Sequence, residues 1–353
     1  MAFVEKSWNV EYDGEGLTKD AWNLGFKRLN FVQNVRSQPS HATHIFQCKF
    51  QLKGDPMQEQ LMKEAAELAY NRDIRFNLSS REETPQRGTV HYHVIYDWVL
   101  RTDQNGFLLV LKTMDRTALA MIQSKTRAHR GTISSMVSAI LEEYGMEVVA
   151  QTTANVSEFS TLLQRNMTDM QFILNELIPR AGGGYSVFTQ DGKKVFFQTL
   201  NHVLPVFQPE MEAVASVREY ETNYASARLG GMIYTVHGFN PFTKKSHIYH
   251  ATPTVEGPKI PMASRYDYVP LQTQEATTAW AKERQLTNND EAFPMQAVFK
   301  GNLGLNLPLE IDFSKTKFRK TCTHSVPVVQ IRHIVTAGRL AQTVTMLRNK
   351  GLV

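Results

Sequence analysis

The sequence has few cysteines, no long apolar run and no signal-peptide pattern. Two of its 353 residues are cysteines, Cys48 and Cys322, and they stand far apart without a Cys-x-x-Cys pair. This argues against a disulfide framework or a zinc site, and we expect Cys48 to be a small buried apolar residue. No apolar run approaches the roughly 20 residues that a membrane span needs. The first residues, MAFVEKSW, also lack the apolar region of a signal peptide. We therefore expect no membrane insertion and synthesis in a cytoplasm.

Catalytic signatures are also scarce. The chain has no GxxxxGK[ST], GxSxG or HExxH sequence, and no stretch concentrates carboxylates as a glycosidase cleft would. We therefore expect neither enzymatic activity nor a cofactor.

One histidine pattern offers half of a metal site. His91 and His93 stand two residues apart in an alternating segment, and Asp97 follows, so a strand would place all three on one face. Nothing in the sequence identifies a further ligand. We interpret these residues as the polar outer face of a barrel strand, and we predict no metal. The pairs His41/His44 and His247/His250 are equally compatible with surface residues and with ligands.

The charge is mild for a chain of this length. The formal net charge is +5 and the isoelectric point is near 9.0, which is short of a dedicated nucleic-acid binder. Basic residues gather in two clusters, which are Lys125, Arg127 and Arg130, and then Lys315, Lys317, Arg319 and Lys320. We expect solvated loops or protected edge strands for both clusters, with contact to an acidic partner or to passing DNA as the alternative.

Alternating residues predict β-structure at both ends of the chain. Residues 89–113 form a hairpin pattern around Asn105-Gly106, and residues 329–346 form another around Ala337-Gly338. The first hairpin follows a strand from His41 and a helix over 55–71. The second follows strands near 212–222, 230–239 and 246–252 and a helix near 274–284. The parallel order suggests two related β-rich domains.

A different pattern lies between them, over residues 119–204. A helix with one apolar stripe is capped by Thr132 and ended by Gly145, and the strand 146–150 follows. A second helix begins near Asn166, and Pro179 with the glycines 182–184 should stop it. A hairpin around Asp191-Gly192 completes the unit. The predicted fold is therefore α+β and β-rich, with related antiparallel β-barrel domains over 1–118 and 205–353 joined by an α+β insertion over 119–204.

Two motifs resemble those of a known family. The segment NMTDMQFILNELIPRAGGGYSVF and the final hairpin VVQIRHIVTAGRLAQTVTMLRN are similar to segments of the hub proteins of contractile phage tails. This family includes the late control D proteins and the N-terminal part of the VgrG spikes of type VI secretion. The matching positions are Asn166, Thr168, Asp169, Phe172, Ile173, Leu177, His333, Gly338, Thr343 and Arg348. We expect them to serve packing.

The resemblance implies a non-enzymatic symmetry adaptor in the baseplate of a virion tail, assembled in the host bacterial cytoplasm. Three chains, each with two barrels, would match a six-fold tail tube to a three-fold central spike. Implied partners are further copies of the chain, the spike protein, tail tube or tube-initiator proteins, the tape measure protein and the baseplate wedge. DNA would pass through the lumen. No needle repeat follows residue 349, so the spike is expected to be a separate polypeptide.

Two alternatives stay open beside this structural hub: a tail-associated cell-wall hydrolase and a VgrG-like secretion hub. For the hub, we expect Lys315, Lys317, Arg319 and Lys320 to lie away from the channel, because a basic lumen would retain passing phosphates. If this segment were extended, Lys315, Lys317 and Arg319 would share one face and could contact an acidic partner.

Overall fold

We analysed a computed structural model of the chain. The residues that it describes are 8–13, 25–35, 38–49, 73–80, 87–103, 106–153, 159–181, 185–199, 204–210, 213–219, 233–240, 243–251, 264–269, 274–275, 277–278, 281, 294–301, 305–319, 325–336 and 338–347. The predicted helix over 55–71, the glycines 182–184, Lys320, Cys322 and Arg348 lie outside these residues, and so does the side chain of Cys48.

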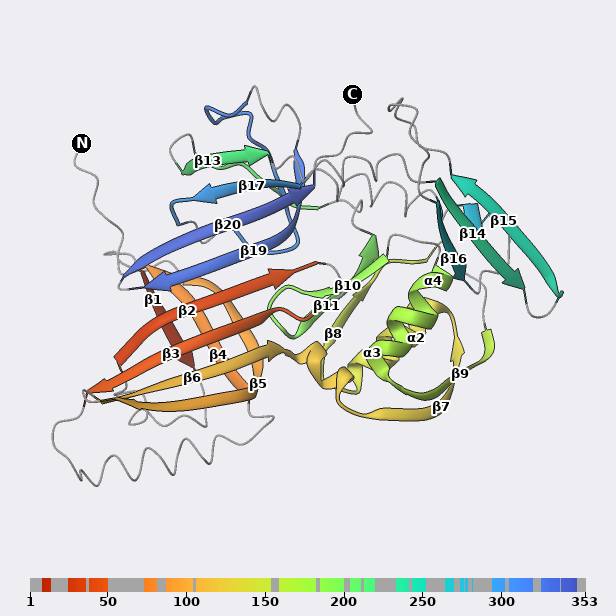
Figure 1. The fold of residues 1–353 in the computed structure, drawn as a ribbon, viewed down its shortest axis with the longest axis horizontal. Coiled ribbons are helices and arrows are strands. Elements are labelled where there is room, and N and C mark those ends of the chain that lie inside the picture. The colour runs from red at the N-terminus through yellow and green to blue at the C-terminus, as the bar shows by residue number, and fades with distance from the viewer. Residues whose placement is uncertain are drawn as a thin grey trace.

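The largest element is a curled sheet of twelve strands (Figure 1). Its main path runs through β1 (Trp8–Asp13), β4 (Asp73–Ser80), β5 (Arg87–Asp103), β6 (Gly106–Asp115), β3 (His41–Lys49), β2 (Gly25–Asn34), β19 (Val326–Thr336), β20 (Arg339–Leu347), β17 (Pro294–Phe299) and β13 (Val214–Glu219). Neighbours along this path are antiparallel. Two short strands, β18 (Glu310–Ile311) and β12 (Val206–Phe207), extend the sheet beside β19.

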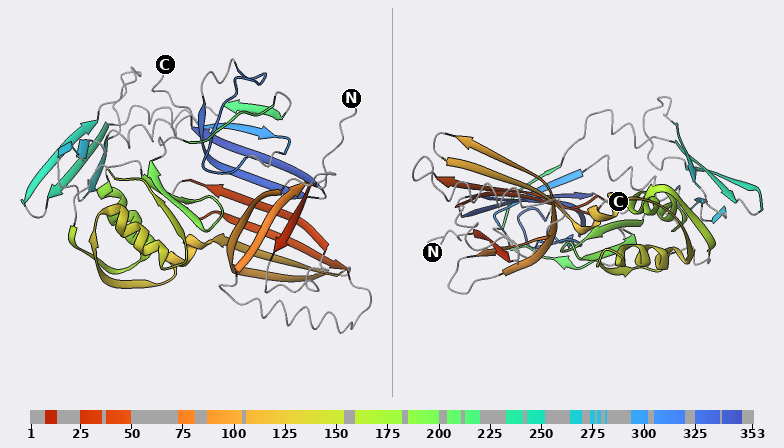
Figure 2. Two further views of the ribbon diagram at one scale, coloured as in Figure 1. Left: turned by 180° about the vertical axis from the view of Figure 1, so that it is seen from behind. Right: turned by 90° about the horizontal axis from the view of Figure 1, so that it is seen from below.

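The two ends of the chain share this sheet through one pairing. Strand β2 pairs with β19, in register from Asn34 opposite Gln330 to Arg28 opposite Thr336. Seen from behind, the red and orange N-terminal strands curl around next to the blue C-terminal strands (Figure 2). The core inside the curl accordingly combines Phe31 and Phe76 with Val335 and Leu340. The expected β-rich character at both ends is confirmed, and the two ends build one continuous sheet.

Both predicted hairpins of this sheet are confirmed. Strands β5 and β6 pair from His93 opposite Asp115 to Asp103 opposite Gly106, and β19 pairs with β20 along its length. Gly338 has a φ of 79° at the second turn, a backbone conformation that glycine adopts without steric cost.

The residues between β6 and β12 form the predicted α+β insertion. Its elements are η2 (Arg116–Met121), β7 (Ser124–Gly131), α2 (Ile133–Glu142), β8 (Glu147–Ala150), β9 (Phe159–Thr168), α3 (Asp169–Phe172), the π-helical turn η3 (Ile173–Leu177), α4 (Ile178–Ala181), β10 (Tyr185–Thr189) and β11 (Lys194–Thr199). Strands β10, β11 and β8 form one small sheet, and β7 pairs with β9. The helices pack between them around a separate apolar core (Figure 1).

The first helix of the insertion follows its sequence pattern. The Thr132 side chain accepts a hydrogen bond from the Ser135 amide at 3.2 Å, which satisfies one of the free N–H groups at the start of α2. Ile133, Met136, Val137, Ile140 and Leu141 are buried on one face. A turn after Glu142 reaches Gly145 at a φ of 70°, as the glycine predicted.

The second helix corrects one prediction. It continues through Pro179 to Ala181, so the proline does not end it. A π-helical turn ends at Leu177, two residues before the proline, and the Ile178 amide donates to the Ile173 carbonyl five residues earlier. This wider turn accommodates a residue that has no N–H to donate and a ring that crowds the preceding turn.

Another three-stranded sheet lies on the far side of the insertion (Figure 1). It contains β14 (Ile233–Asn240) between the antiparallel β15 (Lys245–Ala251) and the parallel β16 (Ser264–Val269). Val236 and Tyr249 pack against the core of the insertion. The predicted strands near 212–222, 230–239 and 246–252 correspond to β13, β14 and β15. None of the helices among the described residues is long and apolar enough to cross a membrane.

Candidate functional site

The sequence motif at 166–177 marks the place where β9 turns into the helix. Asn166 has a φ of 47°, and its amide donates to Thr126 of β7 at 3.1 Å. Thr168 is the N-cap, because its hydroxyl accepts from the Gln171 amide at 3.2 Å while the Gln171 side chain accepts from the Thr168 amide at 2.9 Å. This reciprocal capping box fixes the helix start.

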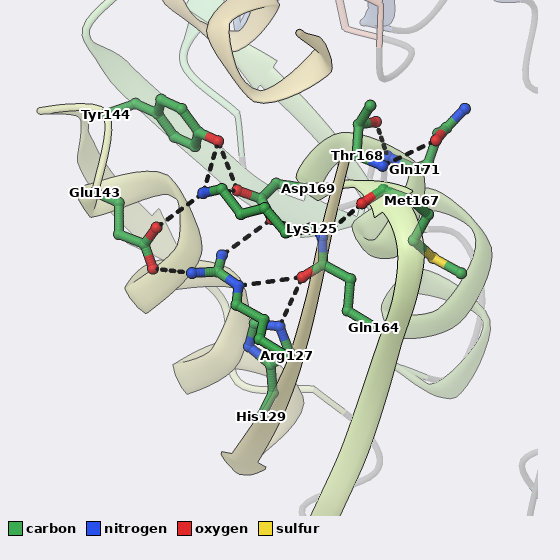
Figure 3. A network of polar contacts seen from close by, with 10 residues as sticks. All are labelled: Lys125, Arg127, His129, Glu143, Tyr144, Gln164, Met167, Thr168, Asp169 and Gln171. Carbon is green, nitrogen blue, oxygen red and sulfur yellow. Dashed lines mark hydrogen bonds and ion pairs between the residues drawn. The ribbon is translucent and has the colours of Figure 1, made fainter. Parts of the chain in front are cut away.

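Asp169, the next residue, lies at the centre of a network of polar side chains (Figure 3). Its carboxylate is 0% exposed and accepts four hydrogen bonds. The donors are Lys125 Nζ at 2.7 Å, Arg127 Nη2 at 3.0 Å, Tyr144 Oη at 2.5 Å and Gln164 Nε2 at 2.8 Å. Because every donor belongs to β7, β9 or the end of α2, this one carboxylate joins three elements of the insertion.

A second carboxylate closes the network on its outer side. Glu143 accepts from Lys125 Nζ at 3.2 Å and from Arg127 Nη1 at 2.5 Å. Two cations therefore stand between two anions, and Figure 3 shows Glu143 and Asp169 on opposite sides of the two basic side chains. Burial alone would raise the pKa of Asp169. The hydrogen bonds from Lys125, Tyr144 and Gln164 and the charge of Arg127 outweigh burial and hold that pKa below its usual value.

The first basic cluster, Lys125, Arg127 and Arg130, is thus neither a solvated loop nor a set of charges that only protects an edge strand. Lys125 and Arg127 point inward from β7, and Arg130 is exposed. The spacing Lys125-x-Arg127-x-His129 was the available signal, because alternate residues of a strand share a face. The strands β7 and β9 were missed because so many of their residues are polar.

The apolar motif residues lie under this network. Phe172 is 1% exposed and stacks on His129, with ring centroids 4.7 Å apart and an interplanar angle of 22°. Ile173 and Leu177 are 0% exposed within the core of the insertion. A saturated carboxylate above packed apolar residues can hold elements together, but it has no free lone pair or mobile proton for catalysis.

The β10–β11 hairpin fastens the insertion to the large sheet. The Tyr92 amide of β5 donates to the Asp191 carbonyl at 2.7 Å, and Lys193 Nζ lies 4.2 Å from the centroid of the Tyr92 ring. Gly192 has a φ of 90°, and a Cβ atom there would lie 2.0 Å from the Tyr92 carbonyl oxygen. The glycine is therefore required by a close approach of two backbones.

Further contacts dock the two strands of the hairpin. Gln33 Nε2 donates to the Gln190 carbonyl at 3.2 Å, and the Thr189 hydroxyl donates to Asp115 at 2.9 Å. Ser186 donates to the Val35 carbonyl, and Phe188 packs in the core beside Val35. That core also contains residues from β13, β17, β19 and β20. The hairpin thus contacts strands from both ends of the chain.

The placement predicted for His91 and His93 is wrong. Both point into the curl of the sheet, and they are 5% and 1% exposed. They pack against Phe31 and Phe76, with ring centroids 4.5 to 5.5 Å apart. The register shifts between Ile95 and Asp97, so Asp97 does not join them and forms an ion pair with Lys112 at 2.6 Å. Period-two alternation showed that the histidines share a face but not which face is buried.

Two more histidines lie in the same interior. His44 of β3 is 0% exposed, and His333 of β19, one of the motif residues, is 2% exposed. Burial lowers the pKa of His44, His91 and His333 to about 3 each, and it lowers the pKa of His93 well below its ordinary value. In the described part of the chain, no three His, Cys, Asp or Glu side chains are grouped as a metal ion would require.

The remaining predicted positions that the structure describes do not form a further site. Thr343 lies in β20 opposite Arg332, and Gly338 lies at the hairpin turn. Lys315, Lys317 and Arg319 are exposed in a series of turns, where the Arg319 amide donates to the Thr316 carbonyl. The segment is not extended, so the condition under which strand alternation would place the three charges on one face is not met.

The overall fold has relatives of known structure, although no protein-family model and no curated protein matches the sequence. The 43 kDa tail protein of prophage MuSo2 from Shewanella oneidensis superposes with a TM-score of 0.65 at 12% identity, over 98% of each chain. The tail protein from Neisseria meningitidis gives a TM-score of 0.64 at 9% identity, over 98% of this chain and 97% of that one.

A third relative comes from a secretion machine. It is an E. coli component of the type VI secretion system, described as similar to the T4 bacteriophage tail proteins gp27 and gp5. The TM-score is 0.55 at 11% identity, over 96% of this chain and 76% of that one. The chain therefore has the fold of phage tail proteins, in agreement with the resemblance to tail hub proteins in its sequence.

Proposed function

We propose that this chain is a structural baseplate hub of a contractile phage tail or a related injection machine. The observation that carries the proposal is the fold shared with two phage tail proteins along nearly the whole of each chain. The proposed role is non-enzymatic and resides in interfaces, and the proposed location is the baseplate of the virion tail.

The hub acts as a homotrimer that adapts a six-fold tail tube to a three-fold spike. Each chain contributes two tube-like parts, over 1–118 and 205–353, and the 119–204 insertion braces them. Support comes from the hairpin β10–β11, which contacts β2, β5 and β6 and also packs in the core of the C-terminal strands. A rigid brace of this kind keeps two parts of a ring at a fixed spacing.

The size of the assembly tests this proposal. We expect the purified chain, alone or mixed with its central spike protein, to have the mass of three copies in light scattering. Electron microscopy of that particle should show a ring with six tube-like parts. A monomeric mass under both conditions would contradict the proposal.

The hub binds the spike on one side and the tube, tube-initiator or tape measure protein on the other, with the wedge around it. We assign one contact to the turns that carry Lys315, Lys317 and Arg319, because these side chains are exposed and basic.

Replacing all three with glutamate should weaken the binding of an acidic tail protein and should cause no other defect in assembly. Reversing the exposed Arg165, Lys245 and Lys300 is the matched control. Equal binding by both triple variants would remove this contact from the proposal.

A second candidate is a VgrG-like hub of a secretion system, favoured by the likeness to the type VI secretion component. Co-purification distinguishes the two candidates, because a phage hub should bind a tape measure protein and a secretion hub should bind only tube and spike proteins.

A cell-wall hydrolase is the remaining alternative. Zymography on bacterial cell walls tests it, and lysis by the purified chain would contradict the structural role.

A further inference from the structure

The interior of the curled sheet has a polar layer at its middle. The buried polar residues of this layer are Gln33, His44, His91, His93, Thr113, Asp115, His333 and Gln342, which come from β2, β3, β5, β6, β19 and β20. Tyr12 of β1, which is partly buried, adjoins them. The interior of a small barrel is usually filled by apolar side chains. Four imidazoles around Phe31 and Phe76 therefore require an explanation.

Uncharged hydrogen-bonding partners link two of the imidazoles, His44 and His93, which burial keeps neutral. Tyr12 Oη lies 2.9 Å from His44 Nδ1, and Thr113 Oγ1 lies 3.1 Å from His44 Nε2 and 3.0 Å from His93 Nδ1. Tyr12 can donate to His44 Nδ1 and His44 Nε2 to Thr113, and the single Thr113 hydroxyl proton is then directed to the Ala42 carbonyl at 3.5 Å or to His93 Nδ1. No partner in this chain of contacts carries a charge that would favour an imidazolium.

His333 shows the same design on the opposite strand. Its Nε2 donates to Gln33 Oε1 at 3.1 Å, and its Nδ1 accepts from Gln342 Nε2 at 3.0 Å. A proton added at Nδ1 would face another donor, so protonation breaks this hydrogen bond unless the Gln342 amide turns over. The phenyl ring of Phe31 stacks on His333 at 5.3 Å and offers no replacement acceptor.

The polar layer reaches the docked hairpin at two points. Gln33, which accepts from His333, donates its own Nε2 to the Gln190 carbonyl of the hairpin. Asp115, which lies opposite His93 in the sheet, accepts from Thr189 of the hairpin. Disturbing the imidazoles therefore disturbs the residues that hold the insertion on the sheet.

We propose that this polar layer and the β10–β11 hairpin form an acid-sensitive joint, in which proton uptake by His44, His91, His93 and His333 opens the layer and releases the hairpin. The direction follows from linkage. A buried imidazole that stays neutral to about pH 3 binds fewer protons than its unfolded counterpart, whose pKa is 6.5. As the pH falls from 6.5 toward 3, each such histidine lowers the ratio of closed to open molecules about ten-fold per pH unit.

The other titratable groups that face the layer modify this effect. Burial raises the pKa of Asp115, so that carboxyl binds its proton at a higher pH in the folded state than in the unfolded state, which opposes the effect of the imidazoles. A protonated Asp115 also has one acceptor fewer for Ser40, Thr117 and Thr189. Burial raises the pKa of Tyr12 further above its ordinary value, so the phenol stays neutral throughout. His41, which is exposed on β3, adds a charge that also lowers the pKa of His93.

Proton uptake on unfolding tests whether the folded layer holds its imidazoles in the neutral form. The slope of the unfolding free energy against pH gives the number of protons bound. We expect His91→Phe, which keeps the ring contacts with Phe31 and Phe76, to reduce the uptake at pH 5 by about one proton. The double variant with His333→Gln should reduce it by about two. Equal slopes in all variants would overturn the proposal.

Hydrogen exchange in the full chain tests the release of the hairpin. After correction for the intrinsic pH dependence of exchange, peptides of β10–β11 should lose protection between pH 7 and pH 4.5 before peptides of α2 do. In His91→Phe this loss should move to lower pH by about half a unit or more, because fewer protons drive it. Loss of protection in the hairpin and α2 at the same pH would overturn the inference, since it would indicate global unfolding without a joint.

Discussion

At the scale of single residues, the motif aspartate has a structural explanation. Asp169 is out of contact with solvent and holds Lys125, Arg127, Tyr144 and Gln164, so its side chain connects two strands and two helices. A residue type that often marks catalysis here organises the folding unit. The two cations are about a quarter exposed, which moderates the energy of the pairs.

Removing this charge should therefore be costly. We expect Asp169→Asn to lower the free energy of unfolding by about 3 kcal/mol, the low end for breaking a buried ion pair, because Lys125 and Arg127 lose their buried partner. Glu143→Gln is the matched control, since that carboxylate is 45% exposed and its pairs should contribute no more than about 1 kcal/mol. Denaturant titration measures both. Similar losses for the two variants would contradict the central role of Asp169.

The buried ring below the network gives a second test. Phe172→Ala should destabilise the insertion by roughly 3–5 kcal/mol, the usual cost of truncating a core aromatic. Leu163→Ala, on the half-exposed face of β9 at 49% exposure, should cost less than about 1 kcal/mol. Thermal unfolding compares them. An unchanged melting temperature for Phe172→Ala would mean that the ring contributes little to the packing.

At the scale of elements, the docked hairpin depends on one glycine. Gly192→Ala and Gly145→Ala both impose an alanine on left-handed backbone, which costs about 1–2 kcal/mol. At Gly192 the new Cβ also meets the Tyr92 carbonyl, so overpacking should add roughly 1–3 kcal/mol. At Gly145 the nearest atom is the end of the flexible Arg116 side chain, at 3.3 Å. Faster exchange of the Tyr92 amide in Gly192→Ala alone is the expected result. Unchanged Tyr92 protection would show that the hairpin can dock without this glycine.

Local sequence patterns predicted the elements whose ends are marked by capping residues or turn glycines. The capped helix α2 and the hairpins around Asp191-Gly192 and Ala337-Gly338 follow from caps, glycines and alternation. Strands β7 and β9 did not, because tertiary ion pairs replace the apolar residues that identify a strand. The inward position of His91 and His93 was also beyond local patterns, since it depends on which face the other strands cover. The prediction that Pro179 ends its helix was wrong because a π-helical turn accommodates the proline.

At the scale of the whole molecule, the two ends of the chain share one core. His333, Val335 and Leu340 pack or bond with residues of β1–β4, and β19 pairs with β2. We therefore expect a fragment of residues 1–118 to lack a cooperative thermal transition, because its interior would be open along β2. Adding the β19–β20 hairpin, residues 326–347, as a linked segment should restore some cooperativity. A sharp transition in the isolated fragment would contradict this shared core.

The seam between β2 and β19 also constrains the order of events during synthesis. Asn30 and Arg332, which bond across the seam, are 302 positions apart. At roughly 5–20 residues per second, a ribosome needs on the order of 15–60 s to deliver the second strand after the first. Strands β1–β6 must wait through this interval with β2 as an unpaired edge in addition to β1, and such edges recruit other strands. The nascent chain therefore depends on a chaperone, or on slow pairing of its early strands, to reach the last hairpin without aggregating.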